Sequence, residues 1–209
     1  MEHFEKRIPL MLELGLREDA VSALRQYVEL LWKSNEELNL ISRKMTFEEL
    51  IDNHVIDCLL PIKIFPMHVK AAADFGAGGG LPGVLYAIQF PEVSYRLYEK
   101  SVLKREFLTR CKAFAPNLKI EGEILPTFKD VDVVTARAFK PLDVILDMSR
   151  NYYQSGGSYF LLKGRREKVD EELGLAQKKF KDLKTDVVEL KSPLLEVERH
   201  LVTIRIPAK

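Results

Sequence analysis

Apolar side chains recur every three or four positions through the first third of the chain. One such stripe covers 21–38 and a second covers 47–58, and this period is that of one face of a helix. Thr46 stands where a side-chain oxygen can cap the second helix, and Pro61 follows its end. The pattern therefore predicts two amphipathic helices, joined by a short connection at 39–42.

From about residue 70 the pattern changes to short apolar or alternating runs that are separated by turn residues or helical stretches. Such alternation is typical of parallel βαβ units. Near the end, 185–190 and 200–206 also have the pattern of strands, with Ser192-Pro193 between them, which predicts an antiparallel pair at a sheet edge. The other strands are expected at 71–75, 94–99, 131–135 and 159–162.

These elements predict an α/β fold with a mostly parallel, doubly wound sheet, an antiparallel edge strand and an N-terminal helical cap. A chain of 209 residues without an internal repeat is long enough to bury the core of such a fold. We expect the helical cap to cover 1–65 and the sheet domain to cover 66–209.

The charge balance limits which partners the surface can bind. Lys and Arg number 32 against 31 Asp and Glu, so the formal net charge is +1. This excludes a globally basic surface for nucleic acid, and any phosphate contact must come from a local patch. Three basic stretches could frame an RNA path or simply form solvated helix faces: Lys100, Lys104, Arg105 and Arg110; Arg165, Arg166 and Lys168; Lys178, Lys179 and Lys181.

Cys58 and Cys111 are too few for a disulfide framework or the usual four-ligand zinc site. The four histidines are scattered without ligand spacing, so we expect no metal. The first residues lack the pattern of a signal peptide, and no apolar run approaches the roughly 20 residues that a membrane span needs. We therefore expect a cytoplasmic protein without a membrane partner, and a monomer.

The most informative stretch is the glycine-rich segment 74–83, Asp-Phe-Gly-Ala-Gly-Gly-Gly-Leu-Pro-Gly. It follows a predicted strand and leads into a helix-like run, which is a switch point where ligands bind in open α/β sheets. Glycine lets the backbone turn tightly and approach a ligand without obstruction. Glu99 ends the next predicted strand, about 20 residues on, where a carboxylate can accept hydrogen bonds from a ribose diol.

Two nucleoside cofactors fit this arrangement. A dinucleotide site needs the spacing G-x-G-x-x-G and brings a pyrophosphate to the helix N-terminus. Here the glycines fall at Gly76, Gly78 and Gly80, and the Asp74 carboxylate would repel a pyrophosphate but could accept from the cationic amino-acid tail of S-adenosylmethionine. This favours the methyl donor over a nicotinamide-dependent oxidoreductase. The alternative without a ligand is a flexible turn with Glu99 in solvent.

The segment 74–83, in which Leu81-Pro82-Gly83 follows the glycines, resembles the cofactor loop of the ribosomal RNA small subunit methyltransferase G family. Further matches lie in the same order along nearly the whole chain. They are Asn39-Leu40, His54 and Asp57, Lys104-Arg105, Ala136-Arg137-Ala138-Phe139, Leu162-Lys163-Gly164 and Glu198-Arg199-His200-Leu201-Val202.

The resemblance implies a class I, Rossmann-like fold and S-adenosylmethionine-dependent methylation of a guanine N7 in small-subunit (16S) ribosomal RNA. The RNA or the small ribosomal subunit would then be the partner. It further implies that the cofactor is bound by the glycine-rich loop and the neighbouring strand ends: Asp74, Gly76, Gly78, Gly80, Leu81, Glu99 and Arg137.

The chain departs from the family pattern at two places. Cys58 stands where the family usually has Ser. The family also places an Arg and one or two acidic residues after the third strand, beside the cofactor adenine, whereas 122–126 lacks that pattern and is shortened. Glu123 and Ile124 are the candidate adenine contacts in this stretch.

Methylation of guanine N7 sets modest chemical demands. N7 already carries a lone pair, so the enzyme must align N7, methyl and sulfur and exclude water, and no general base is expected. Arg or Lys can donate to guanine O6 and to flanking phosphates. Arg137 is the best candidate because it ends a predicted strand at the rim of the glycine-rich loop, although it could instead pair with an acid such as Asp143.

Four further residues are candidates for the catalytic site. Lys163 ends another strand and could line the same rim, and Arg199 could contact phosphate or guanine; simple surface positions are the alternatives. His54 lies within an apolar helical stripe, so it could be a buried core residue, and Asn39 could brace the connection between helices. The resemblance places both at the junction of cap and sheet domain, over the active site.

The glycine-rich loop alone does not name the methyl acceptor. A methyltransferase acting on a small molecule or a protein therefore stays an alternative. A non-catalytic module that binds the cofactor or RNA is the other, because 122–126 is altered.

Overall fold

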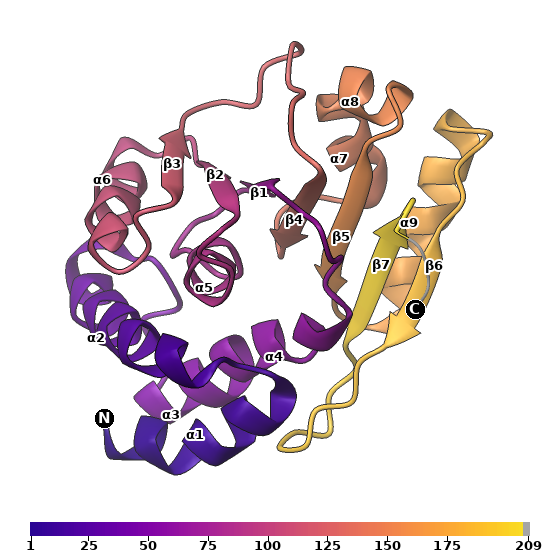
Figure 1. Cartoon of the computed structure of the whole chain (residues 1–209). Helices are drawn as coiled ribbons and strands as arrows, with labels where there is room; N and C mark the ends of the chain where they lie inside the picture. Colours follow the sequence, from indigo (N-terminus) through magenta and orange to yellow (C-terminus); the bar gives the residue numbers. More distant parts are fainter. Residues whose placement is uncertain (207–209) are drawn as a thin grey trace.

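The computed structural model describes residues 1–206, within which seven strands form one sheet (Figure 1). The strands are β1 (Ala71–Phe75), β2 (Ser94–Tyr98), β3 (Leu118–Glu121), β4 (Val133–Arg137), β5 (Ser158–Lys163), β6 (Asp186–Glu189) and β7 (His200–Ile204). Their order is β3-β2-β1-β4-β5-β7-β6. Strands β1 to β5 pair in parallel, β7 is antiparallel to β5, and β6 is antiparallel to β7. The predicted α/β class with an antiparallel edge is confirmed.

The strand order reverses between β1 and β4. From β1 the chain proceeds outward to β2 and β3, and then returns to β4 on the other side of β1. The connections that leave the carboxyl ends of β1 and β4 therefore diverge and leave room between them, which is where open α/β sheets bind ligands. The glycine-rich loop follows β1 at this point.

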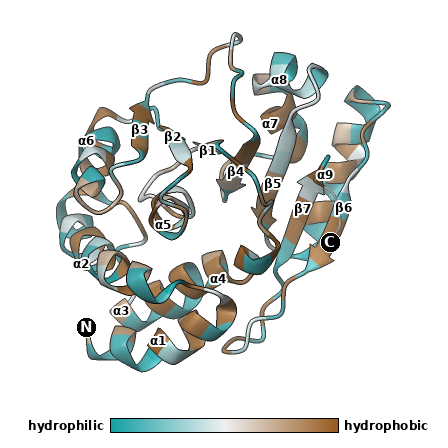
Figure 2. Ribbon diagram, in the orientation of Figure 1, coloured by the Kyte–Doolittle hydropathy of each residue, from teal (hydrophilic) through white to brown (hydrophobic). Residues whose placement is uncertain are grey.

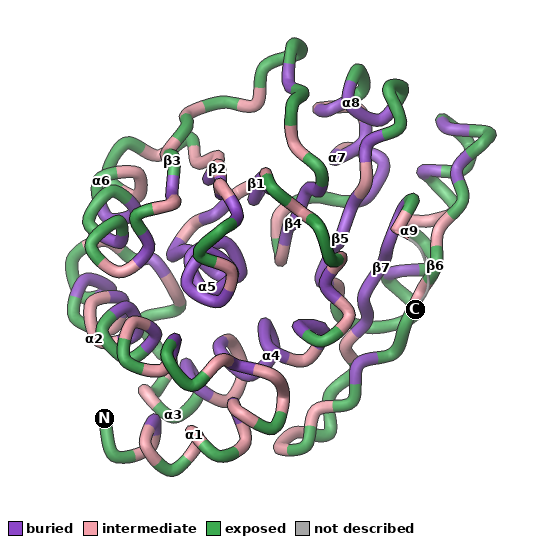
Figure 3. The backbone as a smooth tube through the Cα atoms, viewed as in Figure 1, coloured by how far each residue is buried: buried purple, intermediate pink, exposed green. Residues whose placement is uncertain are grey.

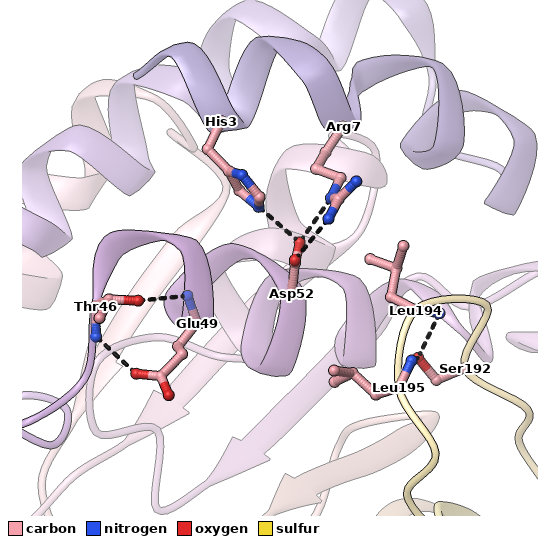
Figure 4. A network of polar contacts seen from close by, with 8 residues as sticks. All are labelled: His3, Arg7, Thr46, Glu49, Asp52, Ser192, Leu194 and Leu195. Atoms are coloured by element: carbon pink, nitrogen blue, oxygen red, sulfur yellow. Dashed lines mark hydrogen bonds and ion pairs between the residues drawn. The ribbon is translucent and has the colours of Figure 1, made fainter.

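The N-terminal helices form the cap that the apolar stripes predict. Its elements are α1 (Glu2–Leu14), η1 (Glu18–Ala20), α2 (Val21–Leu38), α3 (Phe47–Leu50), η2 (Ile51–Val55), α4 (Ile56–Leu59) and η3 (Ile62–Ile64). The predicted second helix is the run of α3, η2 and α4, of which η2 is a π-helical turn. Thr46 caps this run as predicted: its Oγ1 accepts from the Glu49 amide at 3.2 Å, and its amide donates to Glu49 at 2.8 Å (Figure 4).

Asp52 joins the first helix of the cap to the η2 turn. Arg7 donates to its two carboxylate oxygens through Nε and Nη2, each at 2.8 Å, and His3 Nε2 lies 3.0 Å from Oδ1 (Figure 4). The hydrogen bond to Asp52 raises the pKa of the Arg7 guanidinium. This two-pronged contact fixes α1 across the helical run that later supplies the site.

The cap packs directly on one face of the sheet. Helices α5 (Gly83–Gln89) and α6 (Val102–Arg110) cover that face, and residues of α1, α2 and α4 belong to the same hydrophobic cluster as those of α5 and β2. Helix α5 is mostly hydrophobic in Figure 2 and buried along its whole length in Figure 3. Cap and sheet thus share one core, and the division near residue 65 stays a prediction.

A second hydrophobic cluster covers the opposite face of the sheet. It includes residues of α7 (Leu142–Met148), α8 (Arg150–Gln154) and α9 (Arg166–Lys179). The sheet is therefore sandwiched between two helical layers, as a doubly wound fold requires. Among residues 1–206, none of the helices combines the length and the apolar character needed to cross a membrane.

Two buried hydroxyl groups tie cap and sheet domain together. Tyr27 of α2 donates to the carbonyl of Gly79 in the glycine-rich loop at 2.6 Å, and Tyr86 of α5 donates to the carbonyl of Cys58 at 3.0 Å. Because Tyr27 is fully buried, no water can replace its hydroxyl at the Gly79 carbonyl without rearrangement. The position of the loop therefore depends on the cap.

We predict that Tyr27→Phe lowers the free energy of unfolding by about 1–3 kcal/mol, because a buried carbonyl loses its donor. Tyr95→Phe is the matched control: Tyr95 is equally buried, but its hydroxyl has no hydrogen-bond partner, so its removal should be neutral or stabilising. Urea unfolding of both variants measures the difference. Equal losses in the two variants would contradict a role for the Tyr27 hydrogen bond.

Candidate functional site

A cavity of about 440 Å³ lies at the carboxyl ends of β1, β2 and β4. We call it the first cavity. Its walls come from the glycine-rich loop, from Tyr98 at the end of β2 and Glu99 after it, from the segment after β3, and from the cap connection that includes Leu40 to Ser42. Its volume is in the range of sites for small organic ligands. A cavity therefore lies at the point of the sheet edge where the sequence predicts a ligand site.

The glycine-rich loop needs glycine at two positions for different reasons. A Cβ atom on Gly76 would lie 2.1 Å from the Phe139 ring, so this glycine allows an aromatic side chain to pack against the backbone. At Gly78 a Cβ atom would have no neighbour nearer than 3.8 Å, but φ is +54°, a conformation that costs other residues strain. The amides of Gly76 and Ala77 donate to the Tyr98 carbonyl at 3.0 and 3.1 Å and fix the loop against β2.

Glu99, the residue predicted to bind the ribose, lies on the wall of the first cavity. Its Oε2 accepts from the Gly78 amide and its Oε1 from the Ser101 amide, both at 2.9 Å. Each oxygen of a carboxylate has two lone pairs, so both retain the capacity to accept a further hydrogen bond. The side chain is thus oriented by the loop and still able to bind hydroxyl groups of a ligand.

Asp74, which the sequence analysis expects to accept from the cationic tail of the cofactor, is not among the residues that line the first cavity. The residue is 1% exposed, with Oδ2 accepting from the Gly83 amide at 3.2 Å and Oδ1 2.7 Å from Thr135 Oγ1. It is the fourth residue of β1, and its side chain turns beneath the loop toward α5 and β4. In this structure Asp74 supports the start of α5.

Burial raises the pKa of Asp74 to about 7, although its hydrogen bonds with Thr135 and Gly83 oppose the shift. The Thr135 hydroxyl has one proton but lies 3.2 Å from the Ala73 carbonyl as well as 2.7 Å from Asp74. The hydroxyl donates to the Asp74 carboxylate and so favours its ionised form, but burial has the larger effect on the pKa.

Arg137 and His54 meet at the wall between the first cavity and a second one. Arg137 is the last residue of β4, and its Nη2 lies 2.6 Å from Nδ1 of His54 in the η2 turn. Burial lowers the pKa of His54 to about 4, and the charges of Arg137 and Arg199 add to the shift. The neutral imidazole therefore accepts from Arg137. Arg137 does not pair with Asp143, which binds Lys179 at 2.6 Å.

The second cavity measures about 630 Å³ and shares Arg137, His54, Ala138 and Phe139 with the first. It brings together residues from α4, β5, α9 and the segment before β7 that are far apart in the sequence. The two cavities are thus adjacent compartments on either side of one wall.

Two cations predicted for the site line this second cavity, and both are paired with carboxylates. Lys163 Nζ donates to Glu172 at 2.6 Å and to the Lys140 carbonyl at 3.0 Å, while Arg199 Nε donates to Asp57 Oδ2 at 2.6 Å. Burial raises the pKa of Asp57, and the hydrogen bond from Arg199 opposes that shift.

Three of the predicted site residues lie elsewhere. Asn39 lines neither cavity and caps the C-terminus of α2 with φ +49°. Gly80 is a buried residue of the loop that does not line the first cavity, and a Cβ atom on it would be 2.5 Å from Val84. Glu123 is largely exposed and pairs with Lys100 at 3.3 Å, whereas its neighbour Ile124 does line the first cavity, as does Leu81.

Most of the basic stretches are engaged in local contacts. Arg166 pairs with Asp170, Lys168 with Glu171, and Arg105 donates to the carbonyls of Glu99 and Lys100. Lys104 is different, because it lines the first cavity. Within residues 1–206, no three His, Cys, Asp or Glu side chains gather in a group that could hold a metal ion.

Several residues of the walls have no functional signal in the sequence. Asp57 stands out only as part of a motif, and Tyr98, Met45 and Met148 do not stand out, because apolar and aromatic side chains at these spacings are typical of a core. The motif around Ala138-Phe139 could have identified the shared wall.

Comparisons with known proteins agree over nearly the whole chain. A family model described as GidB: rRNA small subunit methyltransferase G matches residues 20–202. The Ribosomal RNA small subunit methyltransferase G 1 of Bdellovibrio bacteriovorus is 70% identical over 203 residues, which cover 97% of this chain and 99% of that protein. The Ribosomal RNA small subunit methyltransferase G of Laribacter hongkongensis is 34% identical over 199 residues, with coverages of 92% and 93%.

Solved structures resemble the fold at low sequence identity. The precorrin-6y C5,15-methyltransferase of Geobacter metallireducens GS-15 gives a TM-score of 0.56 at 15% identity and covers 83% of this chain and 96% of its own. The delta-N METTL16 MTase domain gives a TM-score of 0.57 at 11% identity, with coverages of 91% and 98%. These likenesses concern the fold alone, and they confirm that it is Rossmann-like.

The raised pKa of Asp74 predicts a pH dependence of stability. Between its usual value of 3.8 and about 7, the folded chain keeps a proton on Asp74 that the unfolded chain loses. The stabilisation is therefore complete below pH 4 and is lost as the pH rises to 7, by up to about 4 kcal/mol. Asp74→Asn should flatten this part of the curve in urea unfolding between pH 4.5 and 7.5. An unchanged slope in the variant would show that Asp74 is ionised throughout.

Proposed function

This chain belongs to the rRNA small subunit methyltransferase G family, and on that premise we propose that it methylates N7 of a guanine in small-subunit (16S) ribosomal RNA. We propose S-adenosylmethionine as the methyl donor, bound in the first cavity. The single observation that carries this proposal is the arrangement of Glu99 and the glycine-rich loop on one wall, opposite an Arg137–His54 wall that opens on a second cavity.

The residues of the first cavity suit this cofactor. Glu99 retains lone pairs for the ribose hydroxyls while the Gly78 and Ser101 amides hold its orientation. Gly122 and Ile124 line the side nearest β3, where we assign the adenine, although the acidic residues and Arg typical of the family are missing there. When bound, S-adenosylmethionine supplies an electrophilic methyl group on a sulfonium.

The Arg137–His54 wall suits a methyl transfer that needs no general base. The N7 lone pair attacks directly, so the protein has to align the guanine and exclude water. Positive charge moves onto the guanine during transfer, and a neutral His54 adds no opposing charge at the wall, since its pKa is about 4. Arg137 is the donor that we assign to guanine O6, with N7 left free to react.

The RNA backbone would be bound by a local basic rim. Lys104 lines the first cavity, and Lys140 and Lys168 line the second, close to the paired Lys163 and Arg199. Because the formal net charge is only +1, we expect few phosphate contacts and a modest decline of RNA affinity with salt. We propose that the protein acts in the cytoplasm, where small ribosomal subunits are found.

Transfer of label from methyl-labelled S-adenosylmethionine tests the proposed function. Small ribosomal subunits, naked small-subunit RNA, large subunits and a metabolite extract are each incubated with the protein. We expect label in one guanine of the small-subunit RNA, and cleavage of the RNA there by borohydride and aniline, which identifies N7-methylguanine. Label in protein or in small molecules, with none in RNA, would favour the alternative acceptors.

We predict that Glu99→Ala weakens S-adenosylmethionine binding by roughly 1–3 kcal/mol, because it removes charge-assisted hydrogen bonds to the ribose. Glu121→Ala is the matched control, since this carboxylate at the end of β3 is exposed and does not line the first cavity. Isothermal titration calorimetry measures both affinities. The same affinity in the Glu99 variant and the wild type would exclude Glu99 from the cofactor site.

A further inference from the structure

Asp57 has one carboxylate oxygen without a hydrogen-bond partner although the residue is buried. It lines the second cavity, is 5% exposed, and its Oδ2 accepts from Arg199 Nε at 2.6 Å, while Oδ1 accepts nothing. Arg137 lines the same cavity, and its Nε is also buried and unpartnered. Buried polar groups without partners are rare in folded proteins, and a cavity with one such acceptor and one such donor indicates a polar ligand.

We propose that the second cavity holds the target guanine and that Asp57 binds the N1–H and N2–H groups of its Watson–Crick edge. This inference rests on the proposed function, because it names the recognition of the base that is methylated there. Enzymes that modify a base take it out of the stack into a pocket and identify it by hydrogen bonds to this edge.

The chemistry of the four RNA bases makes a carboxylate selective for guanine. Guanine alone presents two neighbouring N–H donors on its Watson–Crick edge, N1–H and the 2-amino group. Adenine and cytosine present a ring nitrogen that accepts, and uracil presents one N–H between two carbonyls. An ionised Asp57 accepts from both guanine donors and would face an acceptor with each of the other bases.

The positions of Asp57 and Arg137 agree with the direction of methyl transfer. Asp57 on α4 follows His54 on η2 by three residues, so it lies about one helical turn from the wall that both cavities share. N7 lies across the purine from the N1–N2 edge. A guanine whose N1–N2 edge points to Asp57 therefore turns N7 toward the first cavity, and its O6, between N1 and N7, lies on the side of Arg137.

The same contact would strengthen during the reaction. Methylation leaves positive charge on the purine, which makes N1–H and N2–H stronger donors. A hydrogen bond to a carboxylate that improves as charge develops stabilises the transition state more than the bound substrate. Asp57 is thus expected to affect the rate of transfer as well as the affinity for RNA.

Arg199 occupies the other oxygen of this carboxylate, Oδ2, at 2.6 Å. Its side chain is 28% exposed and comes from the segment 190–199 between β6 and β7. Guanine would replace part of the contact between Arg199 and the Asp57 carboxylate. The Arg199 guanidinium would then be close enough to bind a neighbouring phosphate. Arg199 and Asp57 would act on different parts of one nucleotide.

Replacement of the target guanine by inosine tests the proposal, because inosine keeps N7, O6 and N1–H and lacks only the 2-amino group. The methylated guanine is first mapped with wild-type protein, and small-subunit RNA with inosine at that position is then made by ligation and assembled into subunits. Single-turnover methyl transfer gives kcat/KM for both RNAs. We expect the wild type to prefer guanine by roughly 10- to 100-fold.

Asp57→Asn should reduce this preference to less than threefold, since the amide cannot accept at both positions. Asp52→Asn is the matched control: Asp52 lies on the same helical run, also pairs with an arginine, and lines neither cavity, so the preference should be unchanged. Melting temperatures and S-adenosylmethionine affinity of all variants are measured alongside.

Three outcomes would overturn the proposal. One is a wild type that methylates inosine and guanine equally, which decides the matter even if Asp57→Asn does not fold. Another is an Asp57→Asn variant that loses rate equally on both RNAs and keeps the wild-type preference, which would make Asp57 only a support for Arg199. A wild type that methylates no guanine in any RNA would refute the proposed function itself.

Discussion

The hydrogen bond between Arg137 and His54 joins the last residue of a central strand to the helical cap. It needs an imidazole nitrogen that accepts, and burial beside two arginines keeps His54 neutral, with a pKa of about 4. The contact forms the wall between the two cavities, so the geometry of both depends on how the cap sits on the sheet. A cap with its own separate core could shift on the sheet; here the shared core prevents that.

The buried polar groups around the glycine-rich loop also fix the geometry of the first cavity. Tyr27 holds the loop from the cap side, Asp74 holds the start of α5 from beneath, and Glu99 holds Gly78 from the next strand. Each contact uses a different element, so the loop has little freedom despite its glycines. This agrees with the general demand that a site for alignment chemistry be rigid before the ligand arrives.

Much of the fold could be predicted because it depends on short-range patterns. The 3.6-residue period predicted α2 and the helical run at 47–58, and short apolar or alternating runs predicted every strand of the sheet except β3, including the antiparallel edge pair. Helix α1 and strand β3 carried no such pattern. The loop and Glu99 were predictable because the spacing of strand, glycines and carboxylate fixes them to one sheet edge.

The direction of single side chains could not be predicted in this way. Asp74 turned inward because Thr135 and the Gly83 amide lie beneath it, and Lys163 was neutralised by Glu172 on a helix that follows it. Asn39 ends α2 and lines neither cavity. Such outcomes depend on tertiary packing between elements, which local patterns do not encode.

The π-helical turn at Ile51–Val55 constrains how this chain can tolerate insertions and deletions. The Ile56 amide donates to the Ile51 carbonyl five residues back, so the turn contains one residue more than a regular helix would. A deletion there would allow a regular α-helix. It would also rotate the helical segment after the deletion relative to the segment before it by roughly 100°. Asp52 faces α1 and Asp57 faces the second cavity, and they would no longer do so together. The number of residues in this run therefore determines the geometry of the site together with its side chains. Homologous chains should differ there by substitutions far more often than by insertions or deletions.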